Sequence, residues 1–193
     1  NDDIYFQNTE VRNKYYDEAI EIVADYMSKV NTLTGSNFKP FNYYGDESAD
    51  TIIIAMGSVS DTIRQTVDYL NTQGKKYGMI EVHLYRPFSP RYLLSVIPDT
   101  VKKVAVLDRT KEIAANGEPL YLDVVEALKD KDIKVIGGRY GLSSKDTTPA
   151  QIKALFDFMD SGEMHHNFTI GINDDITNLS LKVDDDFVIP NDM

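Results

Sequence analysis

Three arginines of this chain stand in short segments whose composition suits the binding of anions. Arg86 lies between Tyr85 and a Pro-Phe pair that ends at Phe88, Arg109 follows an aspartate, and Arg139 follows two glycines. Arginine pairs with carboxylate and phosphate groups through two parallel hydrogen bonds, and aromatic neighbours add a stacking surface. Each segment follows a short apolar run, and parallel strands end at a common edge of a sheet. The arginines therefore predict one working face.

Two interpretations of this face remain open at the sequence level. It could contact another domain, or it could hold a small anion such as a phosphate or a carboxylate. No base or nucleophile stands beside the arginines, so we expect no catalytic residue and favour the interface. Local pairing is a further alternative: Arg109 could pair with Asp108 or Glu112, and Arg139 could cap a helix or join an ion pair between domains.

The pair Gly57 and Ser58 connects an apolar run to a helical pattern. Free N–H groups at a helix N-terminus favour an anion, but a tight turn also needs glycine for steric reasons, and we favour the steric account. The chain has no G-x-G-x-x-G or Walker pattern and no G-x-S-x-G elbow. Nothing in it therefore indicates a nucleotide site or a serine nucleophile.

Residues that could ligate a metal are scarce. The chain has no cysteine, which excludes disulfides, thiolate catalysis and ligation of iron–sulfur clusters or zinc by Cys within this sequence. The three histidines are His83, His165 and His166. Adjacent side chains point in different directions, so the last two make a poor chelating pair. We therefore expect neither a metal site nor a cofactor-binding residue.

Charge and hydropathy narrow the class of protein. The 31 acidic and 20 basic residues leave a formal net charge of -11, which argues against nucleic acid and acidic membrane surfaces as partners. No apolar stretch approaches the roughly 20 residues of a spanning helix. The start Asn-Asp-Asp is polar, unlike a signal peptide. We expect a cytoplasmic protein.

The first predicted element is an amphipathic helix. Apolar residues recur from Tyr16 to Val30 with the 3.6-residue period of a helix that is apolar on one side. The apolar side of this helix is expected to pack against another part of the protein. Residues 1–14 show no such period and are interpreted as an arm. Residues 31–40 are rich in Thr, Asn, Gly and Ser, a composition typical of a loop.

Apolar and β-branched runs predict the strands. Residues 51–56 form a continuous run that is typical of a strand covered on both faces. The aromatic run at 41–45 precedes it by five residues, too few for a parallel crossover, so the two are antiparallel if they pair. Further strands are expected at 79–84, 103–107, 133–136 and 168–172.

Helix starts between these strands carry clear signals. Ser89 and Thr148 each stand at an N-cap position before a proline, and Gln151 is placed to close a capping box. Helices are expected after the Gly57-Ser58 pair to near Gly74, over 120–128 after Pro119, and over 152–159. The alternation of strands and helices predicts an α/β fold, a three-layer α/β/α sandwich with a mostly parallel sheet and right-handed crossovers.

Seven segments together carry a resemblance to a known family. They are YYGD at 43–46, AMGS at 55–58, LYRPFS at 84–89, VLDRTKE at 106–112, GEPLY at 117–121, GGRYGLSSK at 137–145 and GINDD at 171–175. In residues, order and spacing they closely resemble pyruvate:ferredoxin (flavodoxin) oxidoreductase over nearly the whole chain. The sequence IAAN at 113–116 stands where that family has a turn rich in Pro, Gly and Ala.

The resemblance implies that the chain is a fragment of a much longer, multidomain enzyme. Residues 1–40 would be an N-terminal arm and amphipathic helix at the tail of a preceding thiamine-type domain. Residues 41–182 would form a domain like the C-terminal domain of transketolase, and residues 183–193 a linker to the next domain. For the middle part the resemblance implies a mostly parallel five-stranded sheet with one antiparallel edge strand, in agreement with the strand expected at 41–45.

The resemblance also implies an activity for the parent enzyme, the oxidative decarboxylation of pyruvate to acetyl-CoA with electrons passed to ferredoxin or flavodoxin. The parent would be a homodimer that uses thiamine diphosphate, Mg²⁺, 4Fe-4S clusters and coenzyme A (CoA). None of the family's site motifs occurs in this chain, so the fragment is expected to be an inactive scaffold. Its contacts with other domains are expected at Arg86, Arg109, Arg139, Tyr85, Phe88, Gly57 and Ser58.

Two other functions stay open on the sequence alone. The chain could be an anion-binding module that holds a phosphate or carboxylate through Arg86, Arg109 and Arg139 together with the turn at Gly57 and Ser58. Alternatively, the parent enzyme could act on another 2-oxo acid, such as a branched-chain one or 2-oxoglutarate.

Overall fold

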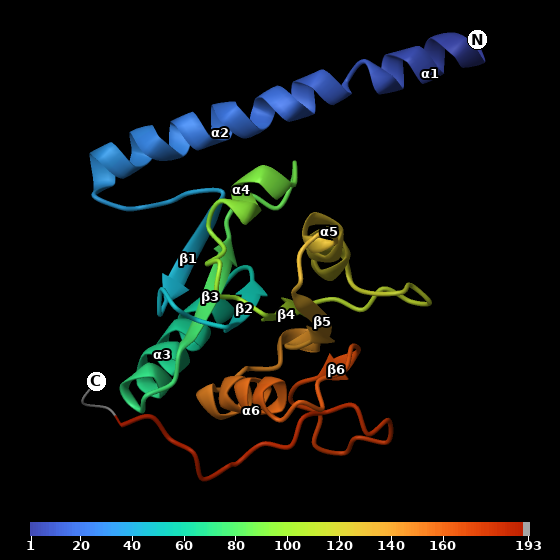
Figure 1. Cartoon of the computed structure of the whole chain (residues 1–193). Helices are drawn as coiled ribbons and strands as arrows, with labels where there is room; N and C mark the ends of the chain where they lie inside the picture. The colour runs from blue at the N-terminus through green and yellow to red at the C-terminus, as the bar shows by residue number, and fades with distance from the viewer. Residues whose placement is uncertain (191–193) are drawn as a thin grey trace.

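A six-stranded sheet organises the chain (Figure 1). The computed structural model describes residues 1–190. The strands lie in the order β1-β3-β2-β4-β5-β6, and all neighbours are parallel except β1 and β3. Their bounds are Phe41–Gly45 (β1), Thr51–Ala55 (β2), Tyr77–Val82 (β3), Lys103–Asp108 (β4), Lys134–Arg139 (β5) and Phe168–Thr169 (β6).

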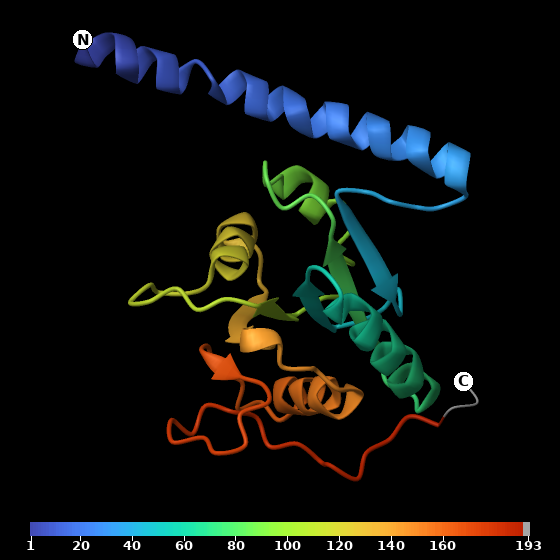
Figure 2. The same cartoon turned by 180° about the vertical axis from the view of Figure 1, so that it is seen from behind.

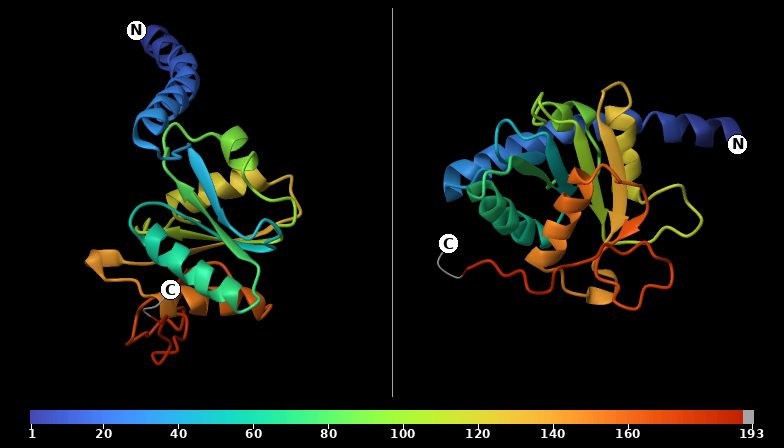
Figure 3. Two further views of the ribbon diagram at one scale, coloured as in Figure 1. Left: turned by 90° about the vertical axis from the view of Figure 1, so that its left-hand side faces the viewer. Right: turned by 60° about the horizontal axis from the view of Figure 1, so that its bottom comes forward.

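Helices cover both faces of the sheet and complete three layers (Figure 3). Helices α3 and α6 pack on one face, and α4 and α5 pack on the other. The predicted α/β/α sandwich is therefore confirmed. The helices are Asp2–Glu10 (α1), Asn13–Thr34 (α2), Val59–Thr72 (α3), Pro90–Leu94 (α4), Pro119–Leu128 (α5) and Pro149–Asp160 (α6), with a short 3-10 turn at Leu142–Ser144.

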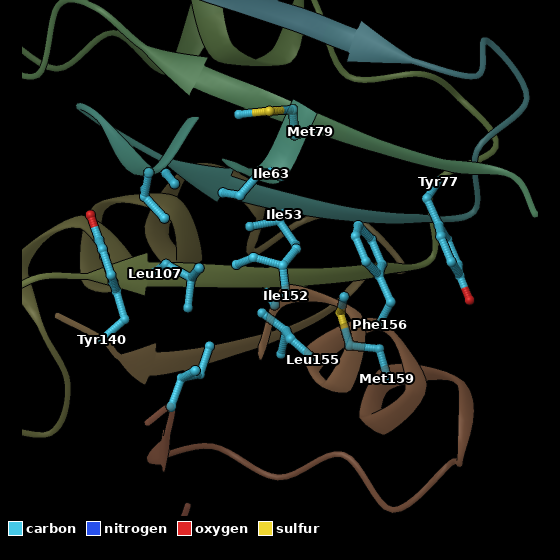
Figure 4. Close-up of a cluster of buried hydrophobic side chains, with 14 of the residues drawn as sticks. Ile53, Ile63, Tyr77, Met79, Leu107, Tyr140, Ile152, Leu155, Phe156 and Met159 are labelled. Carbon is cyan, nitrogen blue, oxygen red and sulfur yellow. The ribbon is translucent and has the colours of Figure 1, made fainter. Parts of the chain in front are cut away.

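The central strands are apolar on both sides because both sides are covered. Along β2, Ile53 points into the apolar core beneath α3 and α6, whereas Ile52 points into the core beneath α4 and α5, as the two-residue period of a strand requires. In the first core the rings of Tyr77 and Phe156 stack with centroids 4.2 Å apart (Figure 4). The strand predicted to be covered on both faces is confirmed.

The edge strand β1 is antiparallel, but its neighbour is β3. Phe41 lies opposite Val82, and Gly45 lies opposite Gly78, while β2 runs parallel to both β3 and β4. The expected antiparallel edge strand at 41–45 is therefore confirmed, and its partner is β3 rather than β2. Five residues can span the roughly 10 Å of two strand spacings, so loop length leaves room for β3 in between. The strand number is corrected, from five to six, by the two-residue β6.

The predicted capping signals are confirmed at two helix starts. The Ser89 hydroxyl accepts the Tyr92 N–H at 3.4 Å at the start of α4. Thr148 and Gln151 form a reciprocal capping box at the start of α6. Each cap satisfies N–H groups that a helix leaves unpaired at its first turn. Pro119 is the first residue of α5, as predicted.

Two helices, α1 and α2, extend away from the sheet at the N-terminal end (Figures 1 and 2). The segment interpreted as an arm contains α1, a helix that the sequence pattern did not indicate. Asn1 accepts the Asp3 N–H at 3.0 Å, and acidic residues occupy the first turn of α1. Both features favour a helix start without any apolar period. Neither α1 nor α2 has a buried residue.

The chain after β6 runs without regular secondary structure past α6 toward α3 (Figure 1). Part of the expected linker packs on the body, since the Phe187 and Tyr69 rings meet edge to face with centroids 5.6 Å apart and Ile189 is buried. Residues 191–193 of that linker lie outside the described residues. No helix within residues 1–190 is long and apolar enough to cross a membrane.

Asp160 ties the end of α6 to β3 and β4. Its carboxylate accepts hydrogen bonds from the Tyr77 hydroxyl at 2.6 Å and the Lys75 amine at 3.1 Å, and the Lys103 amine lies 3.6 Å away. Burial opposes ionisation, but these donors and charges together hold the pKa of the carboxyl below its usual range. A carboxyl with a lowered folded-state pKa stabilises the fold above its unfolded-state pKa. That stability is lost as the pH falls through the folded value.

We therefore expect Asp160→Asn to lower the free energy of unfolding by about 1 kcal/mol at neutral pH. The deficit should shrink as the pH falls below the ordinary pKa of an aspartate and through the lowered folded-state pKa of Asp160, because the wild-type carboxylate is then protonated as well. Urea unfolding followed by circular dichroism at several pH values measures it. Asp157→Asn, which removes an exposed ion pair with Lys153 on the same helix, is the matched control. A deficit for Asp160→Asn that does not change with pH would contradict the assignment.

Candidate functional site

The topology places a crevice at the carboxyl ends of β2 and β4. The chain leaves β2 through α3 on one face of the sheet, and it leaves β4 through α5 on the other face. The strand order reverses between β2 and β4, and open α/β sheets bind ligands outside such a reversal. Gly57 and Ser58 follow β2, and Arg109 follows β4. Three residues singled out from the sequence therefore flank one crevice.

A hollow of about 210 Å³ lies at this crevice. Arg109 reaches its rim, where the guanidinium Nε donates to the Gly141 carbonyl oxygen at 2.8 Å. Gly57, at the turn into α3, has a φ of +79°, which supports the steric account of that glycine. The residues that line the hollow are Ser58, Val59, Thr62, Arg109, Tyr140, Lys145, Asp146 and Thr147.

Arg139 lies at the end of β5 rather than in a loop, and its side chain is only 8 % exposed. Its guanidinium pairs with Glu118 Oε1 at 3.1 Å and donates to the side-chain and backbone oxygens of Asn167 at 3.0 and 3.3 Å. Glu118, 4 % exposed, also accepts the Glu112 N–H at 2.6 Å. The ion pair that the sequence suggested between domains is therefore internal to this one. It joins β5 to the segments before α5 and β6.

Asp108 caps α5 from the end of β4. Its carboxylate oxygens accept the N–H groups of Leu120 at 3.0 Å and Tyr121 at 3.1 Å. Burial raises the pKa of this carboxyl, the two N–H groups oppose that effect, and the charge of Glu118 adds to it. The local pairing suggested for Arg109 is corrected, because Asp108 is turned toward α5 and Arg109 toward Gly141.

Arg86 lies near α5, away from the hollow. Its Nη2 is 2.7 Å from Asp123 Oδ2, and its guanidinium lies 3.9 Å from the centre of the Tyr85 ring. Tyr85 packs against the apolar core beneath α4 and α5. Phe88 packs there too and meets the Phe41 ring edge to face, with centroids 5.5 Å apart. The Arg86 guanidinium therefore stays at the surface beside the Tyr85 ring, whereas Phe88 packs against the core.

The three arginines do not converge on one site. Arg109 lines the hollow, Arg86 pairs with α5, and Arg139 is sealed inside the domain. An anion module built from all three is therefore corrected. Sequence reasoning missed Lys145 and Glu118, which become important only through contacts with distant residues. The one sequence signal for Lys145 was its place at the end of the glycine-rich segment 137–145, which begins within β5.

The histidines do not form a metal-binding cluster within residues 1–190, although His83 Nε2 lies 3.6 Å from a carboxylate oxygen of Glu81. His166 accepts the Gly137 N–H at its Nδ1 at 3.1 Å, and its Nε2 lies 3.0 Å from the Asn116 carbonyl oxygen. Its ring stacks on Tyr121 with centroids 4.2 Å apart. Within residues 1–190 no three His, Asp or Glu side chains stand together as a metal site would require. These residues do not fit the Mg²⁺–thiamine diphosphate or the iron–sulfur clusters implied for the parent enzyme.

Comparison with known proteins identifies relatives over almost the whole chain. The family described as "Pyruvate:ferredoxin oxidoreductase core domain II" matches residues 49–152. The chain is 49 % identical over 187 residues to the pyruvate-flavodoxin oxidoreductase of Enterobacter agglomerans, and 47 % identical over 185 residues to the pyruvate:ferredoxin oxidoreductase of Moorella thermoacetica. The alignments cover 96 % and 95 % of this chain but 16 % of each relative. The chain thus spans about one sixth of their length.

Solved structures with a similar arrangement are more distant. The 2-oxoglutarate:ferredoxin oxidoreductase of Magnetococcus marinus is 20 % identical, with a TM-score of 0.44 over 63 % of this chain and 20 % of that one. A transketolase from Pichia stipitis is 21 % identical, with a TM-score of 0.33 over 64 % of this chain and 17 % of that one. On the match to residues 49–152 and the sequence identities above, the chain belongs to the pyruvate:ferredoxin oxidoreductase core domain II family.

Proposed function

We propose that this chain is a non-catalytic scaffold segment of a pyruvate:ferredoxin (flavodoxin) oxidoreductase. The parent enzyme would convert pyruvate, CoA and an oxidised electron carrier to acetyl-CoA, CO₂ and the reduced carrier. Identity close to one half with relatives of these names, over nearly the whole chain, supports the proposal.

The parent would carry its chemistry in its other domains. Thiamine diphosphate, Mg²⁺, 4Fe-4S clusters and CoA would bind there, and ferredoxin or flavodoxin would accept the electrons. The parent would be a cytoplasmic homodimer. Within this chain, residues 1–40 would belong to the preceding domain, residues 41–182 would form the scaffold domain, and residues 183–193 would lead to the next one.

The observation that carries the scaffold role is the uncovered apolar face of α2. The side chains of Ile20, Val23 and Met27 are partly covered on this helix. A second row, Tyr15, Ile22, Tyr26 and Leu33, is 55–85 % exposed. Spacings of seven, four and seven residues place this second row on one side of the helix. Such a row is a surface for another part of the parent, which is about six times longer than this chain.

The loops at the carboxyl ends of the strands would provide a second contact surface for other domains. Tyr85 and Arg86 combine a ring with a cation that stays more than half exposed. The crevice between β2 and β4 adds Gly57, Ser58 and Arg109 to this surface. Phe88 would support the loop after β3 by packing against the core beneath α4 and α5. Arg139 would serve this surface indirectly, because it holds the segments before α5 and β6 from inside.

The test places a charge on α2 in the full-length parent enzyme. Ile22→Glu combined with Tyr26→Glu should lower the dimer fraction or the thermal midpoint. The rate of pyruvate-dependent viologen reduction per assembled enzyme and the KM for pyruvate should stay near wild type. Ser28→Glu adds a charge to the exposed polar side of the same helix and is the matched control. Light scattering, thermal unfolding and steady-state kinetics provide the three measurements.

The outcomes separate scaffold from catalyst. A changed KM for pyruvate in fully assembled enzyme would give this segment a role in the active site and contradict the proposal. Unchanged assembly and stability would show that α2 is not a contact surface. Viologen reduction that requires 2-oxoglutarate or a branched-chain 2-oxo acid instead of pyruvate would show that the parent acts on a different substrate. It would not contradict the scaffold role.

A further inference from the structure

We propose that the hollow between β2 and β4 is a binding site for a phosphate group, either inorganic phosphate or a phosphate ester. Its central residues are Arg109 and Lys145, with the hydroxyls of Ser58, Thr62 and Thr147 around them. The site shares Ser58 and Arg109 with the contact surface proposed above, so it requires that the other domains leave this hollow open. It lies where the strand order reverses, the position at which open α/β sheets bind ligands.

Arg109 is held in place without being neutralised. Its Nε donates to the Gly141 carbonyl oxygen at 2.8 Å, and Gly141 has a φ of +62° that brings this carbonyl segment close to the guanidinium. The terminal nitrogens form no ion pair within residues 1–190. Four of the other arginines do pair with carboxylates, through Glu81, Asp123, Glu21 and Glu118. A fixed guanidinium with free N–H groups is suited to an oxyanion.

Lys145 supplies a second cation from a different connection. It follows the turn after β5, and its amine forms no ion pair with any carboxylate among the described residues, not even with Asp146 beside it in the hollow. In a chain with a net charge of -11, carboxylates are plentiful. The two unpaired cations on the wall of this hollow, Arg109 and Lys145, therefore create a local positive potential that favours the binding of an anion.

The start of α3 adds neutral donors to these charges. The Ser58 side chain makes no cap hydrogen bond to its own helix, so its hydroxyl is available to a ligand. Gly57 leaves open space at the turn, with nothing within 4 Å of where a Cβ would stand. The 14-residue helix also directs the positive end of its dipole toward this side.

The arrangement suits phosphate better than a carboxylate. Donors come from three chain connections, after β2, β4 and β5, and a tetrahedral anion with several oxygens can meet all three at once. Tyr140, 7 % exposed, forms a wall of the hollow and donates its hydroxyl to the Met56 carbonyl oxygen at 3.4 Å. Asp146 lines the hollow and Asp61 lies in the first turn of α3. These two carboxylates oppose an anion and limit its affinity.

The test titrates inorganic phosphate into the full-length parent enzyme saturated with its thiamine cofactor, by calorimetry at constant ionic strength. The double variant Arg109→Gln, Lys145→Gln should weaken the saturable phosphate binding by about tenfold or more. Lys145→Gln alone changes only an exposed side chain and should show a smaller loss in the same direction. The charge-matched control Lys76→Gln, Lys129→Gln removes two exposed lysines outside the hollow and should bind like wild type.

Three results would overturn the site. Phosphate binding that is equal in the double variant and wild type would place the anion elsewhere. An equal loss in the control pair would reduce the effect to net charge. Acetate that binds as tightly as phosphate at the same ionic strength would contradict the assignment to a phosphate group.

Discussion

Arg139→Met is expected to lower the free energy of unfolding by about 3–5 kcal/mol, because it removes one partner of a buried ion pair. Methionine keeps the volume of the arginine stem, so the loss reports on charge rather than on a cavity. Glu118, 4 % exposed, would keep its negative charge without the guanidinium 3.1 Å away. Asn167 would lose the donor to its side-chain and backbone oxygens.

Urea unfolding followed by circular dichroism measures this loss in a chain that has no tryptophan. Arg86→Met is the matched control, because the ion pair of Arg86 with Asp123 leaves the arginine 54 % exposed, and it should cost about 0.2–1 kcal/mol. Adding Glu118→Gln to Arg139→Met should recover part of the stability by removing the unpaired charge. An Arg139 variant that is no less stable than the Arg86 variant contradicts the buried network.

Gly138→Ala is expected to cost about 1–3 kcal/mol through overpacking. A Cβ at this position of β5 would overlap the Phe168 ring, and Phe168 is fully buried in the core beneath α3 and α6. The Phe168 ring has little freedom to move away from the added methyl group, because Phe168 is a residue of β6 and its backbone is fixed in the sheet. The glycine is therefore needed for the close approach of a side chain rather than for a turn.

A double-mutant cycle with Phe168→Leu tests this cause. If the alanine methyl meets the ring, Gly138→Ala should cost less in the Phe168→Leu background than in the wild type, with a coupling of about 0.5 kcal/mol or more. Additive losses would mean that Gly138 is required by the strand backbone and not by Phe168. The same unfolding measurement serves both halves of the cycle.

Local patterns in the sequence were sufficient to predict the main helices and strands and their arrangement in three layers. The β-branched run at β2, the helical period of α2 and the capping box at Thr148 each act over a few residues, and each was confirmed. Alternation of such elements restricts the fold to layers of helices on a mostly parallel sheet. The edge at which the Arg109, Gly57 and Ser58 loops meet also followed, because parallel strands must end together.

Pairings between distant residues required the tertiary structure. Loop length kept 41–45 from a parallel pairing with β2, but the insertion of β3 between them depends on which apolar faces fill the core. The glycines at 137 and 138 resemble a loop in sequence, yet they lie in β5 and make room for the rings of Tyr121 and Phe168.

The different environments of the three arginines also depend on contacts between distant residues. Their positions after apolar runs predicted that all three follow strands, whereas Arg139 is the last residue of β5. No local pattern distinguished one arginine from another. Arg139 is neutralised by Glu118, 21 residues away in the chain, whereas Arg109 stays unpaired within residues 1–190 beside Lys145 in the hollow. Burial and the distance to a carboxylate decide whether a cation holds the fold or remains free for a ligand, and both are set only when the chain has closed on itself.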